Sequence, residues 1–259
     1  MRGILSLEVQ MEGNDGELYV RVLGMSAAEP WNGWDNQAIE ITDGEHSYLI
    51  DAGSGKVAGR EYDTVFITHY HIDHTRYLFD IKAHQYVGPD LMPHDEFPEA
   101  SVHDAWERPD HRLEGLIERD GTVLDTFDAT GDPIHVYEDD RISVHALPTY
   151  HSPLVQSTGY LIENKATGNS LWVSGDFHHF RTKACEDYLR SAAPSFSLVE
   201  ATFYDDGQPP DHQNLTTATA LAGDLGLEDY RLVHISFRWE GHVDKHEDII
   251  ASPDEVYSF

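Results

Sequence analysis

The chain has 259 residues, with 47 Asp and Glu against 17 Lys and Arg and a formal net charge of −30. This acidity disfavours binding to nucleic acids, whose phosphate backbones are held mainly through Lys and Arg, and it is explained either by a salt-adapted surface or by an ordinary acidic protein. No apolar run approaches the roughly 18–20 residues of a membrane span. Cys185 is the only cysteine, which excludes an internal disulfide and favours a cytoplasmic location.

The first half of the chain carries short apolar runs separated by Gly, Asp and Asn, a pattern typical of β-strands joined by turns. The strands are expected at residues 18–23, 38–41, 48–50 and 64–68. Residues 70–77 should form a loop that enters a short helix. Residues 87–133 are rich in Pro, Asp, Glu and His, and we expect loops with one or two helices there, as a flap or a helical insertion.

Strand patterns return in the second half and alternate with helical ones. The strands are expected at residues 142–147, 159–162, 170–174, 197–199 and 232–235, and the helices at residues 182–191 and 215–225. Two blocks of strands, each followed by helices, predict an α/β domain in which two packed sheets are flanked by helices. With no linker or repeat in view, residues 1–259 are expected to form this single domain.

A His-x-His-x-Asp-His motif at residues 69–74 directly follows the strand expected at 64–68. His69 and His71 share a face of an extended chain, and the following turn brings Asp73 and His74 to a second point nearby. Imidazole and carboxylate ligands without a thiolate suit Zn²⁺, and also Mn²⁺ or Fe²⁺. The alternative is a His-rich surface loop, but so many ligand types directly after an apolar strand favour a metal site.

Three further candidate ligands each lie where an expected strand ends, namely His151, Asp176 and His234. Each could instead be an ordinary loop residue. A pair of metals needs more ligands than the first motif supplies, and the three together complete such a set.

This order of motifs resembles the metallo-β-lactamase superfamily, and the resemblance covers nearly the whole chain. It implies an αββα sandwich and a hydrolase that binds two Zn²⁺, with Mn²⁺ as the alternative. His71 stands where the di-iron flavoprotein branch has Glu, and Asp176 stands where zinc β-lactamases typically have Cys. Carried over by motif, the ligands would be His69, His71 and His151 for one metal, Asp73, His74 and His234 for the other, and Asp176 as a bridge.

Three segments are similar to RNase Z: residues 200–203, residues 233–239, and the region from His151 to residue 163. The similarity implies that His212, which lies 22 residues before His234, is the general acid for the leaving oxygen, and that Glu200 orients it. Val199 replaces the histidine that begins the family's His-Glu-Ala-Thr motif.

RNase Z has a long tRNA-binding arm where this chain has a short turn at residues 163–170. A small phosphodiester is therefore the expected substrate, as in the arm-less relatives that include the anti-Pycsar phosphodiesterases, and a cyclic nucleotide opened to a nucleoside monophosphate is the first choice. Ser236 and Arg238 would bind the phosphate, and Asp73 would also accept the proton of the attacking water. The resemblance also implies a homodimer.

Three other functions remain open on the sequence alone. A tRNA 3′-processing endonuclease would need a basic surface stripe. An esterase or lactonase could use the same metals, although the segments at Glu200 and His234 argue against it. A non-catalytic metal-binding protein would not need an acid such as His212. Finally, the turn that begins at Asp51 is expected to lie below the metals, with Asp51 as a hydrogen-bond partner of a ligand.

Overall fold

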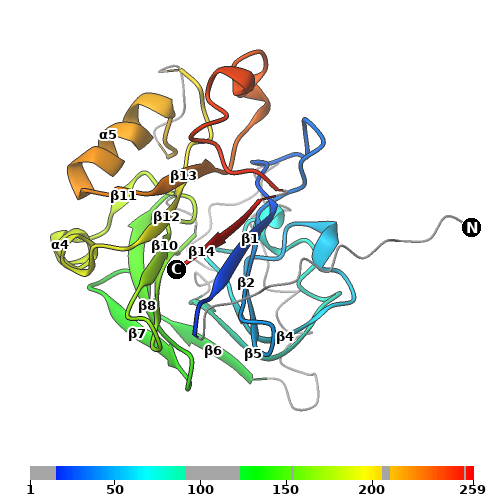
Figure 1. The fold of residues 1–259 in the computed structure, drawn as a ribbon, viewed down its shortest axis with the longest axis vertical. Coiled ribbons are helices and arrows are strands. Elements are labelled where there is room, and N and C mark those ends of the chain that lie inside the picture. The colour runs from blue at the N-terminus through cyan, green and yellow to red at the C-terminus, as the bar shows by residue number, and fades with distance from the viewer. Residues whose placement is uncertain (1–15, 91–122, 153–154, 206–210, 254) are drawn as a thin grey trace, which may run out of the picture.

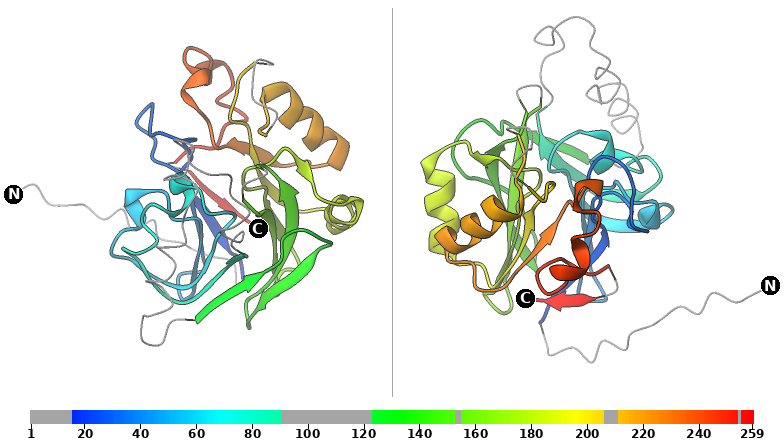
Figure 2. Two further views of the ribbon diagram at one scale, coloured as in Figure 1. Left: turned by 180° about the vertical axis from the view of Figure 1, so that it is seen from behind. Right: turned by 90° about the horizontal axis from the view of Figure 1, so that it is seen from above.

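A computed structural model describes residues 16–90, 123–152, 155–205, 211–253 and 255–259. Two β-sheets pack face to face, and helices lie on their outer sides (Figures 1 and 2). This is the αββα sandwich that the sequence predicts.

Among the described residues, the first sheet has seven strands in the order β14-β1-β2-β3-β4-β5-β6. The pairs from β14 to β3 are antiparallel, and the pairs from β3 to β6 are parallel. The strands are β1 (Tyr19–Gly24), β2 (Ala38–Thr42), β3 (Ser47–Ile50), β4 (Glu61–Phe66), β5 (Lys82–Pro89), β6 (Val123–Phe127) and β14 (Val256–Ser258).

The second sheet runs β11-β8-β9-β10-β12-β13, and β7 pairs with β8. The strands β10, β12 and β13 are mutually parallel, whereas the other pairs are antiparallel. The strands are β7 (Ile134–Glu138), β8 (Ile142–Tyr150), β9 (Ser157–Asn164), β10 (Ser170–Val173), β11 (His179–Phe180), β12 (Phe196–Glu200) and β13 (Tyr230–Val233).

Strand periodicity divides the apolar side chains between two cores. In β2, Ile39 and Ile41 point into the large core between the sheets, whereas Ala38 faces the outer side of the first sheet. Leu49 in β3 also faces outward, and the short helices and turns of residues 54–81 cover that side. Burial of both faces explains why most positions of β2 and β3 are apolar.

The helices of the second sheet begin and end with regular caps. The Thr182 hydroxyl accepts a hydrogen bond from the backbone N–H of Cys185 at the start of α4, and Asn214 and Thr217 form a capping box at the start of α5. The Asn214 cap fixes the loop that holds His212. The helices are η1 (Gly55–Val57), α1 (Ile72–Thr75), α4 (Lys183–Ala192), α5 (Leu215–Leu225), η3 (Phe237–Trp239) and η4 (Val243–Lys245).

Within the segment expected as a flap, residues 87–133, two stretches are strands instead, residues 87–89 and 123–127, whereas residues 128–133 form turns. Residues 87–89 close β5, and β6 pairs with β5 in parallel, with Gln85 opposite Val123. The sequence carries no signal for β6 because Asp125 and Thr126 are polar and exposed, and no signal for β5 because its residues 82–85 are exposed or only partly covered. Residues 91–122 lie outside the described residues, so the flap stays a prediction for them. Among the described helices, none is long and apolar enough to cross a membrane.

Candidate metal-binding active site

The expected ligands meet because they follow strands that end at one edge of the sandwich. His69 follows β4, and Asp176 and His234 follow the parallel strands β10 and β13. The carboxyl ends of parallel strands share one edge of a sheet, so polar side chains placed there converge. A glycine makes the turn before Asp176: Gly175 has φ +61°, and a side chain on it would come within 2.7 Å of the Thr158 carbonyl oxygen.

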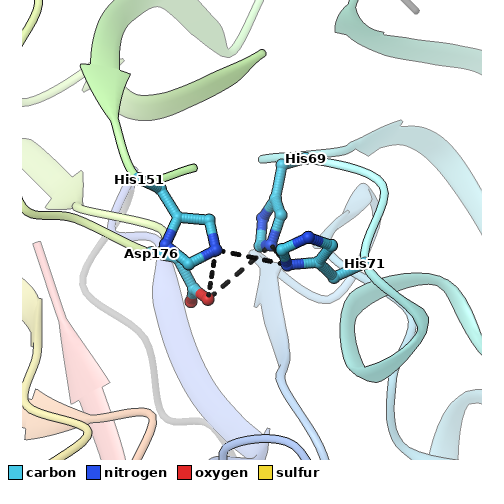
Figure 3. A group of neighbouring side chains, drawn as sticks. All are labelled: His69, His71, His151 and Asp176. Carbon is cyan, nitrogen blue, oxygen red and sulfur yellow. Dashed lines mark hydrogen bonds and ion pairs between the residues drawn. The ribbon is translucent and has the colours of Figure 1, made fainter. Parts of the chain in front are cut away.

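The first candidate metal group consists of His69, His71, His151 and Asp176 (Figure 3). His71 Nδ1 lies 2.9 Å from His69 Nε2 and 3.2 Å from His151 Nε2. The Oδ2 atom of Asp176 is 3.6 Å from His69 Nε2 and 3.5 Å from His151 Nε2. Three nitrogens and one oxygen therefore face a common centre.

The second candidate group consists of Asp73, His74 and His234. The Nε2 atoms of His74 and His234 are 3.1 Å apart, and Asp73 Oδ2 lies 3.3 Å from His234 Nε2. The other oxygen of Asp176, Oδ1, is 3.2 Å from His74 Nε2. Asp176 thus presents one oxygen to each group, the position that a bridging ligand requires.

The distances between the imidazole nitrogens match the donor spacing around one ion. Two nitrogen ligands at ~2.0–2.1 Å from a metal, separated by ~90–110°, lie about 2.9–3.4 Å apart. The buried Asp176 Oδ1 lies 3.2 Å from both His74 Nε2 and His234 Nδ1, and among the described residues neither contact is a well-directed hydrogen bond. The donor set therefore fits divalent cations. Buried neutral imidazoles whose nitrogens face one another at 2.9–3.2 Å would otherwise leave lone pairs or N–H groups unpaired.

The protonation states of the metal-free site agree with this fit. Burial lowers the pKa of His69 and of His151 well below the ordinary value, so both rings are neutral and can offer a lone pair. Burial also opposes the charged form of His74, but Asp176 and Asp51 outweigh it and raise the His74 pKa well above the ordinary value. A proton on His74 offsets buried negative charge, and a cation would displace it.

Hydrogen bonds from outside the two groups orient the imidazole rings. Asp51 Oδ2 lies 2.7 Å from His74 Nδ1, and Asp51 also accepts from the Thr68 N–H at 2.8 Å. His151 Nδ1 lies 3.0 Å from the Asp211 carbonyl oxygen, which fixes Nε2 as the free nitrogen. Asp51 therefore forms a hydrogen bond with the candidate ligand His74, as the sequence predicts.

Two of these residues have left-handed backbones, with φ +60° at Asp51 and φ +58° at His234. Such a conformation costs of order 1–3 kcal/mol for a residue other than glycine and persists only where the surroundings hold it. Both strained positions lie at the candidate metal groups, where strain of this kind commonly accompanies function.

The partly buried His212 and the fully buried Glu200 form a pair beside the metal groups. His212 Nδ1 is 3.1 Å from Glu200 Oε1 and 3.9 Å from Asp176 Oδ2. Burial disfavours the charged imidazole, but the Glu200 carboxylate outweighs it and raises the pKa of His212 to about 9. Sequence reasoning did not assign a role to Thr202, whose hydroxyl contacts Glu200, His212 and His234.

A cavity of about 720 Å³ opens over both groups. Ser236 and Arg238, the expected phosphate-binding residues, line it together with the exposed Phe237. The Ser236 hydroxyl already donates to the Thr202 carbonyl oxygen at 2.5 Å, so it has no free proton for a phosphate. Arg238 lies over the Phe237 ring at 5.4 Å and has no carboxylate partner among the described residues.

Known proteins share this architecture. A search of curated proteins finds no match in sequence. Similar solved structures include the metallo-beta-lactamase fold protein YhfI of Bacillus subtilis (TM-score 0.67, 18% identity, covering 94% of this chain and 100% of that chain) and the short form of human tRNase Z (0.66, 19%, 92% and 98%). A diphosphatase of the PhnP family is also similar (0.65, 15%, 94% and 97%).

These identities support the fold alone, but the family model adds a match in sequence. The model described as the beta-lactamase superfamily domain matches residues 46–235, which contain every candidate metal ligand. The chain therefore has the metallo-β-lactamase fold and belongs to the beta-lactamase superfamily, as its motifs predict.

Proposed function

We propose that the protein is a two-metal phosphodiesterase that hydrolyses a small phosphodiester, and that this substrate is a cyclic nucleotide, which the enzyme opens to a nucleoside monophosphate. The observation that carries the proposal is the pair of the partly buried His212 and the fully buried Glu200, beside Asp176, the residue that faces both candidate metal groups. A simple metal-binding protein has no need of a protonated imidazole there, whereas cleavage of a phosphate ester must protonate the departing alkoxide.

The roles of the residues follow from their contacts. Two divalent ions in these groups would activate a water molecule and neutralise the phosphate oxygens. Asp73 accepts a hydrogen bond from the Ala28 N–H at 2.7 Å, and its carboxylate can also accept the proton of the attacking water. Since Nδ1 of His212 faces Glu200, its Nε2–H is the group that can donate to the leaving oxygen.

The size of the site and the surface charge favour a small substrate. A cavity of about 720 Å³ is in the range that encloses ligands of nucleotide size. Residues 165–169 form a turn between β9 and β10, where RNase Z carries its tRNA-binding arm. A net charge of −30 also opposes the counterion release on which tRNA binding relies.

The residues at the mouth of the cavity favour a substrate that carries a nucleobase. Ala27, Ala28 and Phe203 line it, and the Phe237 side chain at its rim is 63% exposed. A nucleobase can stack on an aromatic ring exposed at the edge of a binding site. Arg238 beside Phe237 can pair with a phosphate oxygen.

The direct test is a substrate panel. Protein loaded with Zn²⁺ or Mn²⁺ is incubated with purine and pyrimidine 3′,5′-cyclic nucleotides, a precursor tRNA and a lactone, and the products are identified by mass. We expect nucleoside monophosphates from the cyclic nucleotides. Cleavage of the precursor tRNA alone would assign an endonuclease, and opening of the lactone alone would assign a lactonase.

A matched pair of variants controls this test. The double substitution His69→Ala and His71→Ala should abolish both metal binding and hydrolysis. His145→Ala, which removes a histidine of β8 outside both candidate metal groups, should preserve them. Turnover by the double variant in metal-stripped buffer would refute the metal mechanism.

A further inference from the structure

One buried hydroxyl connects the candidate metal groups to the acid pair. The Thr202 Oγ1 atom lies 2.9 Å from His234 Nδ1 and 3.2 Å from His212 Nδ1, and it donates a short hydrogen bond to Glu200 Oε1. Thr202 is 5% exposed. It lies two residues after Glu200, the last residue of β12, so the strand that places Glu200 also places this hydroxyl.

The direction of each hydrogen bond follows from which of the groups carries a hydrogen that it can donate. An ionised carboxylate only accepts, so the single proton of the Thr202 hydroxyl goes to Glu200. The hydroxyl oxygen is then an acceptor at 2.9 Å from His234 Nδ1, and Asp176 Oδ1 lies 3.2 Å from the same nitrogen. Two acceptors facing His234 Nδ1 favour the tautomer that carries its proton there, and the shorter contact is the one to Thr202. His234 Nε2 is left with its lone pair, and this is the atom that lies 3.1 Å from His74 Nε2.

The backbone of Thr202 holds the same neighbours. Its N–H donates to Glu200 Oε1 at 3.1 Å. Its carbonyl oxygen accepts from the N–H of Ser236 at 3.2 Å and from the Ser236 hydroxyl at 2.5 Å. Since Ser236 lies two residues beyond His234, Thr202 supports the strained turn that presents the His234 ring.

We propose that Thr202 is a positioning residue with two effects: its hydroxyl sets the tautomer of His234, and it holds Glu200 in place for His212. The second metal group and the acid pair would then share one hydrogen-bonded unit rather than act independently. The tautomer effect concerns metal binding alone, whereas the effect on the acid rests on the proposed function.

The test compares Thr202→Val, which keeps the shape and removes the hydroxyl, with Thr202→Ser, which restores it. The affinity for Zn²⁺ is measured by competition with a chelator. We expect Thr202→Val to weaken the second Zn²⁺ by ~10–100-fold, the usual effect of removing a partner of a metal ligand, and Thr202→Ser to recover most of the loss. Thr64→Val removes another buried threonine hydroxyl, in β4 outside both groups, and should leave the affinity unchanged.

A spectroscopic readout needs no substrate and no variant. The ¹⁵N chemical shifts of the Zn²⁺-loaded wild-type protein should show His234 protonated at Nδ1 and free of a proton at Nε2. The opposite tautomer would overturn the proposal even if Thr202→Val failed to fold. Unchanged Zn²⁺ affinity in a folded Thr202→Val variant would overturn it as well.

Kinetic measurements on the same variants separate the role of Thr202 from the proposed function. On a cyclic nucleotide, Thr202→Val at saturating metal should lower kcat more than it changes KM, because the acid pair acts on the leaving group rather than on binding. If the protein cleaves no phosphodiester but Thr202→Val still loses Zn²⁺ affinity, the proposed function fails and the metal-positioning role stands. Equal kcat values for Thr202→Val and wild type would remove the link to the acid.

Discussion

The Nε2 atoms of His74 and His234 lie 3.1 Å apart, although 160 positions separate the two residues in the chain. His74 belongs to α1, which follows β4 of the first sheet, and His234 follows β13 of the second sheet. The candidate metal site therefore exists only when the two sheets are packed together, and metal binding must be coupled to folding.

Metal binding should release protons. The carboxylates of Asp176 and Asp51 raise the pKa of His74 well above its ordinary value, so the metal-free site holds a proton that a cation must displace. Affinity should therefore rise with pH as His74 loses that proton. Titration calorimetry in two buffers of different ionisation enthalpy measures the release, and a value of zero near neutral pH would contradict this protonation state.

Replacing Asp51 with Asn should weaken metal binding without removing a ligand. Asn tolerates the left-handed backbone of Asp51, but it cannot give the charged hydrogen bond that His74 Nδ1 now makes at 2.7 Å. We expect a loss of ~10–100-fold in metal affinity, measured by chelator competition. Asp229→Asn, at an exposed position just before β13, serves as the control. Wild-type affinity in Asp51→Asn would show that the carboxylate has no part in the site.

Replacing Glu200 with Gln should shift the pH dependence of hydrolysis. The Glu200 carboxylate raises the pKa of His212 to about 9 against the effect of burial, so its removal lowers that pKa. His212 then loses its proton at lower pH, and the basic limb of the kcat profile should move in the same direction. At pH 8 we expect turnover of an alkyl phosphodiester to fall by up to ~10², with a smaller effect on an aryl ester whose leaving group needs no proton.

The control for this series is Glu163→Gln, at an exposed position of β9. Its pH profile should match that of the wild type. A Glu200→Gln profile that superimposes on the wild-type profile would show that Glu200 does not act through His212.

Replacing Phe237 with Ala should weaken recognition of the base. Stacking of a base on an aromatic side chain is worth ~1–3 kcal/mol, so KM for a cyclic nucleotide should rise by ~5–150-fold while kcat stays near the wild-type value. Phe237→Trp should preserve the low KM, and a cyclic ribose phosphate without a base should not discriminate between the variants. Val256→Ala, which shortens another exposed apolar side chain, is the control. Equal KM values for Phe237→Ala and wild type would exclude stacking.

Spacing in the sequence predicts the convergence of the site because each candidate ligand follows an apolar strand. His69, His151, Asp176 and His234 all lie where such a strand ends, and their order matches a known family. Strands with exposed or partly covered polar residues give no comparable signal, and for this reason neither β6 nor the first half of β5 is predicted from the sequence.

Two side-chain contacts could not be predicted, because the motifs that contain Thr202 and Ser236 do not specify the partners of their hydroxyls. Thr202 looks like an ordinary strand-end threonine until its hydroxyl is placed between His234 and Glu200. Ser236 looks like a phosphate ligand until the structure shows that its hydroxyl donates a hydrogen bond to the Thr202 carbonyl oxygen. The ligand roles, the homodimer and the cytoplasmic location stay predictions.

The most direct test of the two-metal site is native mass spectrometry of the protein after loading with Zn²⁺ and removal of excess metal. We expect two ions per chain in the wild type and fewer in Asp176→Asn, because Asp176 presents one oxygen to each candidate group. A wild-type chain that retains no metal under these conditions would contradict the account.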